Sequence, residues 1–309
     1  MKLVTFVHEN GPEKVGAMLD DETTLVDLSD DFPRMLDLID AGPDGLETAR
    51  KAVASAERTL PLRSVSLRAP LPVPRQIRDC MLFEKHLRQA GEQFVRMQFG
   101  KLAGLILGLG LVKIPKVWYE QPIYYKANRF SVIGPDQEVI WPNYSELMDF
   151  ECELGIVIGK KGKDIARDRA GEHIFGYTIF NDMSARDAQF KEMKGRLGPA
   201  KGKDFDTGNI IGPYLVTADE IPDPYNLTMI ARVNGEEWGR GHSGQMHHRF
   251  EDLIVHVSRC ETLYPGELLG SGTVGNGCGL EHGRFLCPGD TVELEIDGLG
   301  VLRNRLVKP

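Results

Sequence analysis

The chain has 309 residues, of which 41% are hydrophobic and 27% are charged, and its formal net charge is −8. These values are those of an ordinary globular protein that folds in water, with enough chain for one large or two modest domains. Because the net charge is negative and no long basic run occurs, we expect neither nucleic acid nor an anionic membrane as the main partner.

Three features bear on the cellular compartment. The first ten residues alternate and include an early acid, unlike a signal peptide. The longest apolar run, at 102–112, is shorter than the ~20 residues that cross a bilayer, so we expect a buried segment or part of a pocket wall. The cysteines are odd in number and show no C-x-x-C spacing, which favours reduced thiols in a cytoplasmic protein. They are Cys80, Cys152, Cys260, Cys278 and Cys287.

The beginning of the chain predicts a small α/β domain. Three short stretches alternate between apolar and polar residues, which predicts an antiparallel meander. These stretches are 3–7, 14–19 and 24–27. Residues 31–58 then predict helices, and the proline-dense stretch 69–74 favours the extended backbone of a linker. We therefore expect a small N-terminal domain at 1–70 and a catalytic domain at 71–309.

From residue 75 onward, short strands dominate, with many Gly and Pro turns between them. The predicted strands are 132–134, 137–141, 151–158, 174–180, 214–217, 227–233, 291–296 and 300–305. The predicted helices are 83–98, 185–193 and 250–258. This pattern favours a β-rich, barrel-like domain with a few helices.

Glu151 and Glu153 are two residues apart in a predicted strand, so their side chains point to the same face. Two carboxylates so close together repel each other, and burying them is costly. A hard divalent cation would remove this conflict, because Mg²⁺, Mn²⁺ and Ca²⁺ prefer carboxylate oxygens. The alternative is that both side chains face solvent on an amphipathic strand.

Two motifs, in order and about thirty residues apart, resemble those of the fumarylacetoacetate hydrolase family. D-F-E-C-E-L begins at Asp149, and G-Y-T-I-F-N-D-M-S-A-R-D begins at Gly176. The family pairs an E-x-E strand with a later G-Y-x-x-x-N-D-x-S-A-R-D segment. The likeness covers roughly residues 70–309. It implies an α+β, mostly β fold, in which a mixed β-roll or barrel domain follows a small N-terminal α/β domain, and it implies a homodimer.

The resemblance also implies a metal site. Glu151, Glu153 and Asp182 match the family's three carboxylate ligands, and Asp79 is a candidate for a fourth. Asp79 precedes His86 by seven residues, as in the branch that cleaves fumarylacetoacetate. The cation would be Mg²⁺, Mn²⁺ or Ca²⁺. Otherwise Asp182 would be a helix N-cap or turn residue, and Asp79 an exposed residue at a helix start.

The resemblance places the general base at His86, in a predicted helix. A histidine can take a proton from water near neutral pH, although a lone helical histidine is usually a surface residue. Relatives with a short lid have a glutamate three residues later, where this chain has Gln89. Glu281, in the C-terminal glycine-rich loop, is then the candidate partner of His86. The alternative is that Glu281 is an ordinary loop acid.

Further residues match positions at which the family holds its substrate. Lys203 matches the lysine of a G-K-x-F-D motif, where a cation stabilises enolate charge, and Lys201 is the competing assignment. The substrate-binding candidates are Tyr125, Gln189, Arg96 and Thr273. For Tyr125 and Gln189 the alternative is local packing.

Three hypotheses about function follow. The first is a metal-dependent hydrolase that cleaves a C–C bond in a 1,3-dicarbonyl or acylpyruvate-like acid, with water activated by His86. The second is a decarboxylase, isomerase or hydratase of a 2-oxo acid at the same metal site, because a fold does not fix a reaction. The third is a non-catalytic, metal-stabilised binding protein. We also expect residues 102–112 to line or cap a pocket for an apolar acyl group.

Overall fold

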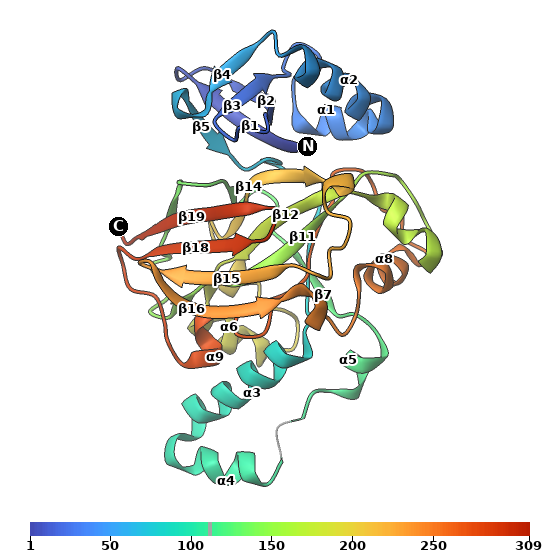
Figure 1. Ribbon diagram of the computed structural model, residues 1–309. Helices are drawn as coiled ribbons and strands as arrows, with labels where there is room; N and C mark the ends of the chain where they lie inside the picture. The colour runs from blue at the N-terminus through green and yellow to red at the C-terminus, as the bar shows by residue number, and fades with distance from the viewer. Residues whose placement is uncertain (111–112) are drawn as a thin grey trace.

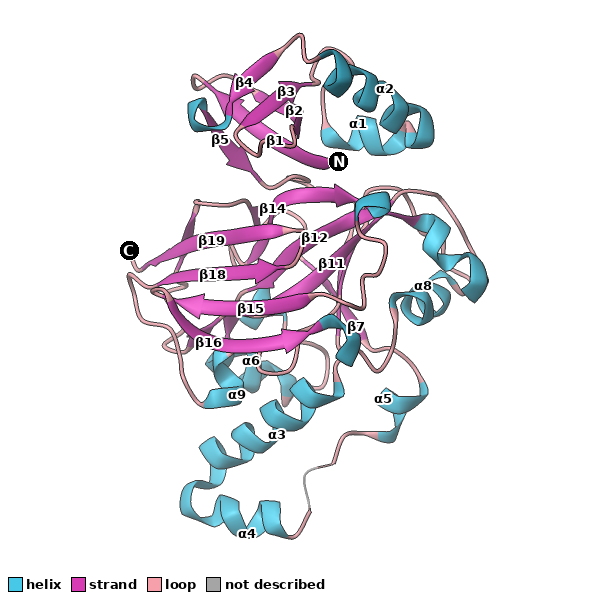
Figure 2. Cartoon of the chain, in the orientation of Figure 1, coloured by secondary structure: helices cyan, strands magenta, loops and turns pink. Residues whose placement is uncertain are grey.

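The computed structural model describes residues 1–110 and 113–309. Within them, two large β-sheets form the body of the molecule, and helices lie at its top, side and foot (Figures 1 and 2). The main path of the twelve-stranded sheet is, in spatial order, β4 (Thr59–Pro61), β3 (Thr24–Asp27), β2 (Glu13–Met18), β1 (Lys2–His8), β14 (Asn209–Thr217), β12 (Ile174–Asp182), β11 (Cys152–Ile158), β17 (Leu268–Gly270), β6 (Ile77–Cys80) and β7 (Tyr124–Ala127). Off this path, β5 (Val65–Arg68) pairs with β1, and β8 (Val132–Ile133) pairs with β14.

The second sheet has five strands and packs against the first. Its spatial order is β16 (Glu236–His242), β15 (Thr228–Val233), β18 (Thr291–Ile296), β19 (Gly300–Val307) and β9 (Glu138–Ile140). A short ribbon pairs β10 (Met148–Asp149) with β13 (Ser184–Ala185). The α-helices are α1 (Met35–Asp40), α2 (Gly42–Ser55), α3 (Glu84–Phe99), α4 (Ala103–Gly108), α5 (Lys116–Glu120), α6 (Arg186–Met193), α7 (Ala200–Lys203), α8 (Phe250–Ser258) and α9 (Gly279–His282).

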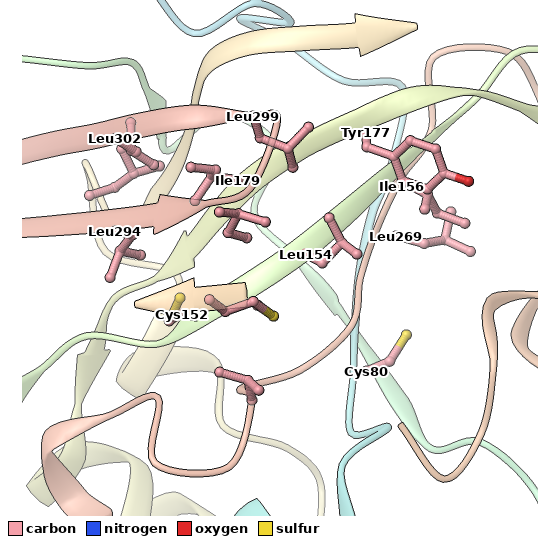
Figure 3. Close-up of a cluster of buried hydrophobic side chains, with 14 of the residues drawn as sticks. Cys80, Cys152, Leu154, Ile156, Tyr177, Ile179, Leu269, Leu294, Leu299 and Leu302 are labelled. Atoms are coloured by element: carbon pink, nitrogen blue, oxygen red, sulfur yellow. The ribbon is translucent and has the colours of Figure 1, made fainter. Parts of the chain in front are cut away.

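The main hydrophobic core lies between the two sheets. Leu154 of β11 and Ile179 of β12 are fully buried in the same cluster as Leu294 of β18 and Leu302 of β19 (Figure 3). Full burial of each such side chain contributes about 1.5–3 kcal/mol. On β11 the core residues alternate with Glu153, so one face of the strand builds the core and the other presents a carboxylate.

The N-terminal residues extend the large sheet. β1 pairs antiparallel with β14, and Leu3 lies opposite Leu215. Both leucines belong to a second hydrophobic core, in which residues of α1 and α2 pack with residues of the large sheet. The division of the chain near residue 70 remains a prediction, and the β1–β14 pairing shows how the two parts are connected.

The predicted mostly β fold with mixed sheets is confirmed, and the described strands do not close into a barrel. The predicted helices correspond to α3, α6 and α8 with ends that differ by at most one residue. The strand predicted at 214–217 is the end of the longer β14. β16 was not expected, because its sequence EEWGRGH has few apolar residues, as suits a strand at the edge of a sheet.

The apolar run at 102–112 differs from its prediction. Leu102, Leu105 and Leu109 are 64, 65 and 64% exposed, so the expected burial is wrong for these three leucines. The reason is that α4 packs beside the end of α3, away from both sheets (Figure 1). Residues 111 and 112 lie outside the described residues, and the capping of an acyl pocket remains a prediction. None of the described helices combines the length and apolar character needed to cross a membrane.

Candidate active site

Four carboxylates gather near one end of the large sheet. Asp79 lies on β6, Glu153 on β11 and Asp182 at the end of β12, while Glu151 immediately precedes β11. Each side chain offers an oxygen, and these oxygens all lie within 4.8 Å of one another. All four residues are buried. The structure therefore brings together the four residues that the sequence singled out as metal ligands.

Three oxygens of this cluster are buried and have no hydrogen-bond partner among the described residues. They are Asp79 Oδ1, Glu153 Oε1 and Asp182 Oδ1. Leaving a buried polar atom without a partner costs roughly 1–3 kcal/mol, and more for a charged group. A hard divalent cation would satisfy all three oxygens at once. The residues present thus fit Mg²⁺, Mn²⁺ or Ca²⁺, because every donor in the cluster is an oxygen.

The four carboxyl groups differ in acidity. Burial, followed by the charge of Asp182, raises the pKa of Asp79 well above its ordinary value of 3.8. Burial and the charge of Asp79 likewise raise the pKa of Glu153 well above 4.5. Burial also acts to raise the pKa of Glu151, but nearby cations, of which Lys203 is the strongest, outweigh burial and lower it. Burial raises the pKa of Asp182 above 3.8 as well. In the metal-free protein, Asp79 and Glu153 therefore hold protons more readily than Glu151.

Lys203 and Arg186 supply the positive charge of the site. Lys203, at the end of α7, is buried, and its Nζ lies 2.9 Å from Glu151 Oε2 and 2.5 Å from Asp182 Oδ2. Nη1 of Arg186, at the start of α6, lies 2.6 Å from Glu151 Oε1. Burial acts to lower the pKa of Lys203, but Asp182 and Glu151 raise it above the ordinary value. Lys203 is therefore a permanent cation beside the carboxylates.

Gly270, on β17, leaves the space that two of the carboxylates occupy. A Cβ atom there would lie 2.7 Å from Glu153 Oε2 and 2.8 Å from Asp79 Oδ1. We expect Gly270→Ala to displace both side chains and to weaken metal binding by roughly 10–100-fold, as do other changes next to metal ligands. Calorimetric titration with Mn²⁺ measures this affinity. Gly171→Ala is the control, because a Cβ there meets no heavy atom within 4 Å. Equal affinities in the two variants would contradict this account.

His86 and Glu281 are in contact although 195 residues separate them. His86 lies in the first turn of α3, and its Nδ1 is 3.1 Å from Glu281 Oε1. Glu281 lies in α9, where its other oxygen accepts the backbone N–H of Cys278 at 3.1 Å, and its side chain is 0% exposed. An ionised carboxylate can only accept, so in a neutral imidazole facing it the hydrogen belongs on Nδ1 and the lone pair on Nε2.

Asp149 belongs to the site, although the sequence alone suggested no role for it. It is fully buried, and its Oδ2 accepts hydrogen bonds from Nε and Nη2 of Arg186 at 2.8 and 2.7 Å. It also accepts two backbone N–H groups at the start of α9, at 2.7 and 3.0 Å. Asp149 therefore links the carboxylate cluster, through Arg186 and Glu151, to the helix that carries Glu281. The sequence did contain a hint of this role, because Asp149 lies in the first of the two family motifs and Arg186 in the second.

Two of the predicted substrate-binding residues, Tyr125 and Gln189, are linked to the carboxylate cluster by hydrogen bonds, directly or through Arg186. The hydroxyl of Tyr125 donates to Asp182 Oδ2 at 2.6 Å. Gln189, on α6, accepts a hydrogen bond from Arg186 Nη1 at 3.0 Å. Thr273 is buried, and its hydroxyl has no partner among the described residues, so it is available to a ligand. Whether these residues bind substrate remains a prediction.

Arg96 and Lys201 lie farther away. Arg96 comes ten residues after His86 on α3, which is roughly 15 Å along the helix axis. Its side chain is exposed, and its role remains a prediction. Lys201 is also exposed, with its Nζ 5.6 Å from the centre of the Tyr144 ring. The structure therefore places Lys203, rather than Lys201, among the carboxylates.

Other proteins are similar to this chain in sequence over most of its length. Residues 84–307 match the family described as "Fumarylacetoacetate (FAA) hydrolase C-terminal". The protein named "Oxaloacetate tautomerase fahd2, mitochondrial" from Xenopus laevis is 35% identical over 315 residues, which cover 99% of this chain and 90% of that protein. "Oxaloacetate tautomerase FAHD2A, mitochondrial" from Homo sapiens is 36% identical over 276 residues, which cover 88% of this chain and 79% of that protein.

Solved structures share the fold over the whole chain. A putative HpcE protein from Mycobacterium smegmatis is 27% identical, with a TM-score of 0.78, and the match covers 100% of this chain and 99% of that one. A fumarylacetoacetate hydrolase from Exiguobacterium antarcticum is 26% identical, with a TM-score of 0.76 and complete coverage of both chains. Together with the two motifs and the site built around them, these matches show that the chain belongs to the fumarylacetoacetate hydrolase family.

Proposed function

We propose that this protein is a metal-dependent tautomerase of a small, enolisable 2-oxo acid of the oxaloacetate type. The observation that carries the proposal is the contact of His86 with Glu281, 3.1 Å apart, beside carboxylates that fit a divalent cation. Against the effect of burial, the charges of Lys203, Arg186 and a protonated His86 all act to lower the pKa of Glu151, so His86 lies close to that carboxyl. The relatives named oxaloacetate tautomerases support this reaction. We therefore favour the isomerase of a 2-oxo acid, which belongs to the second hypothesis, over the C–C hydrolase of the first.

The residues of the chain account for the proton transfers. Glu281 holds the hydrogen on Nδ1 of His86, so Nε2 can take a proton from the carbon next to the carbonyl and return it to the enol oxygen. A divalent cation on the four carboxylates would supply positive charge next to the carbonyl oxygen, and Mg²⁺, Mn²⁺ and Ca²⁺ all suit these ligands. Lys203 stabilises negative charge on the substrate, and the Thr273 hydroxyl donates a hydrogen bond to the substrate.

The test compares the wild-type protein with His86→Asn. With Mg²⁺ or Mn²⁺ present, we expect the wild type to accelerate the enol–keto exchange of oxaloacetate, and the variant to be slower by at least about 100-fold, as is usual when a general base is removed. The exchange can be followed by the ultraviolet absorbance of the enol and by deuterium uptake at carbon. His8→Asn, in β1, is the matched control. Wild-type rates in His86→Asn would overturn the assignment of the base.

A C–C hydrolase of a 1,3-dicarbonyl or acylpyruvate-like acid is the second candidate. The His86–Glu281 pair favours it as well, because the same base could take a proton from water instead of from carbon. A panel of acylpyruvates in ¹⁸O-water separates the two reactions. Label in a released carboxylic acid would establish hydrolysis, whereas an unlabelled tautomer would establish the first reaction.

The assembly and the location also belong to the proposal. We propose a homodimer, which light scattering of the purified protein measures directly. The cytoplasmic location remains a prediction, and the word mitochondrial in the names of the Xenopus laevis and human relatives describes those proteins. Apart from the oxo acid and the metal, we expect neither nucleic acid nor a membrane as a partner.

A further inference from the structure

A second group of metal-binding side chains lies on the side of the site that holds the base. His86, Cys278 and Glu281 each offer one ligand atom, and these three atoms lie within 4.8 Å of one another. His86 comes from α3, while Cys278 and Glu281 belong to the start of α9. Among the residues that the structure describes, no other cysteine lies in such a group.

The three donors differ in kind from those of the carboxylate cluster. They are an imidazole nitrogen, a thiol sulfur and a carboxylate oxygen, which together suit Zn²⁺ and similar thiophilic cations. Mg²⁺ and Ca²⁺ prefer sites made of oxygen only. Three protein ligands leave a fourth tetrahedral position for water, as is common for accessible zinc sites. The two groups in the site would therefore select different ions.

The backbone already holds the three side chains close together. Cys278 is the N-cap residue of α9, and its Sγ accepts the backbone N–H of Glu281. Cys278 is 1% exposed, whereas the His86 side chain keeps 11% of its surface accessible, so an ion would reach the group from the histidine side. On binding, a bond from Sγ to the metal replaces the S–H bond, and the proton is released to solvent.

We propose that His86, Cys278 and Glu281 form an inhibitory site for a thiophilic divalent cation such as Zn²⁺. The bound ion takes the lone pair of one imidazole nitrogen and one oxygen of Glu281. The hydrogen of the neutral imidazole then sits on the other nitrogen, so neither nitrogen is left to act as a base. The inhibitory consequence rests on the proposed role of His86 as the base. The binding of the ion rests only on the three side chains.

Cys278→Ser separates binding from folding. Serine is a favoured N-cap residue, so the variant keeps the cap of α9 but loses the soft sulfur ligand. Cys287→Ser is the matched control, because Cys287 is exposed and lies outside the group. We expect both variants to remain active when no thiophilic ion is present.

The experiment titrates Co²⁺ into the full-length protein with Mg²⁺ in excess. The carboxylate cluster contains no sulfur, so a thiolate-to-cobalt absorption band in the near ultraviolet reports only on the group with Cys278. We expect this band in the wild type and in Cys287→Ser, its removal by Zn²⁺, and its loss in Cys278→Ser. His86→Asn provides a second variant, in which Co²⁺ binding should weaken by at least roughly tenfold. A band that persists in Cys278→Ser, or that is absent from the wild type, would overturn the site.

Activity in the same titration gives the second readout. With Mg²⁺ in excess, we expect Zn²⁺ to inhibit the wild type and Cys287→Ser, and Cys278→Ser to need at least roughly ten times more Zn²⁺ for the same inhibition. If the band forms but Zn²⁺ leaves the rate unchanged, the metal site stands, while its inhibitory role and the assignment of His86 as the base both fail. If the rate falls equally in all three proteins, inhibition does not pass through Cys278.

Discussion

Replacing Asp149 with asparagine is expected to lower the free energy of unfolding of the metal-free protein by about 3–5 kcal/mol, because one charge of a buried pair is removed. Asp149 and Arg186 are 0 and 2% exposed, so water cannot take the place of the lost carboxylate. In the wild type, both carboxylate oxygens accept hydrogen bonds, from Arg186 and from the backbone at the start of α9. Asparagine replaces one of these oxygens with an NH₂ group, which is itself a donor and cannot accept them. Urea unfolding followed by circular dichroism measures the effect.

An exposed pair of the same kind provides the control. Arg34 binds Asp37 with two nitrogens, as Arg186 binds Asp149, but these side chains are 74 and 29% exposed. We expect Asp37→Asn to change the free energy of unfolding by less than about 1 kcal/mol. If Asp149→Asn were equally mild, the buried link between the carboxylates and α9 would be unimportant for the fold.

Raising the pH is expected to destabilise the metal-free protein. The pKa values of Asp79 and Glu153 are raised on folding, so above pH about 4.5 the folded state holds protons that the unfolded state has lost. The free energy of unfolding then falls as pH rises, by at most about 1.4 kcal/mol per pH unit for each group, until the folded pKa is passed. The pKa of Glu151 is lowered instead. The stabilisation from ionised Glu151 is fully present above about pH 4.5 and is lost only at lower pH. It therefore does not offset the loss of stability expected as the pH rises.

Glu153→Gln tests this account and the metal site together. Without its titrating group, the metal-free variant is expected to be more stable than the wild type near pH 8, and its stability should depend less steeply on pH.

The affinity of Glu153→Gln for Mn²⁺ should fall by at least about 100-fold, because a ligand is lost. Changes to residues that merely contact a ligand often reduce metal affinity by 10–100-fold. Urea unfolding across pH 5–8 and calorimetric titration provide the two measurements. Glu138→Gln, at an exposed position of β9, is the control. Parallel pH profiles in wild type and Glu153→Gln would refute the explanation.

Local periodicity accounts for the part of the site that could be predicted from residues alone. Glu151 and Glu153 share a face because side chains in a strand alternate. Asp182 joins them because β11 and β12 pair antiparallel, which places the end of one strand beside the beginning of the other. That pairing follows from the resemblance of the two motifs, since no spacing in the sequence specifies which strands are neighbours. The same holds for His86 and Glu281, which are 195 residues apart in the chain.

Features that depend on packing between distant elements could not be predicted in this way. The ion pair of Asp149 with Arg186 requires β10 and α6 to meet, and periodicity describes only the faces of a single element. The three exposed leucines in and beside α4, Leu102, Leu105 and Leu109, show the opposite case. Their apolar character suggested burial, but burial requires a partner surface, and α4 extends past the sheets beside the end of α3. Hydrophobicity alone does not show where a helix projects.

The pairing of β1 with β14 also protects the protein from unwanted association. Lys2 and Leu3 cover the edge of β14 at Val216 and Leu215, and the surrounding core closes over the same region. A chain shortened to residues 71–309 would present this stretch of β14 as an open strand edge with apolar residues beside it. Such edges invite strand addition by other molecules and lead to aggregation. β1 thus covers an edge of the sheet that carries the carboxylate cluster.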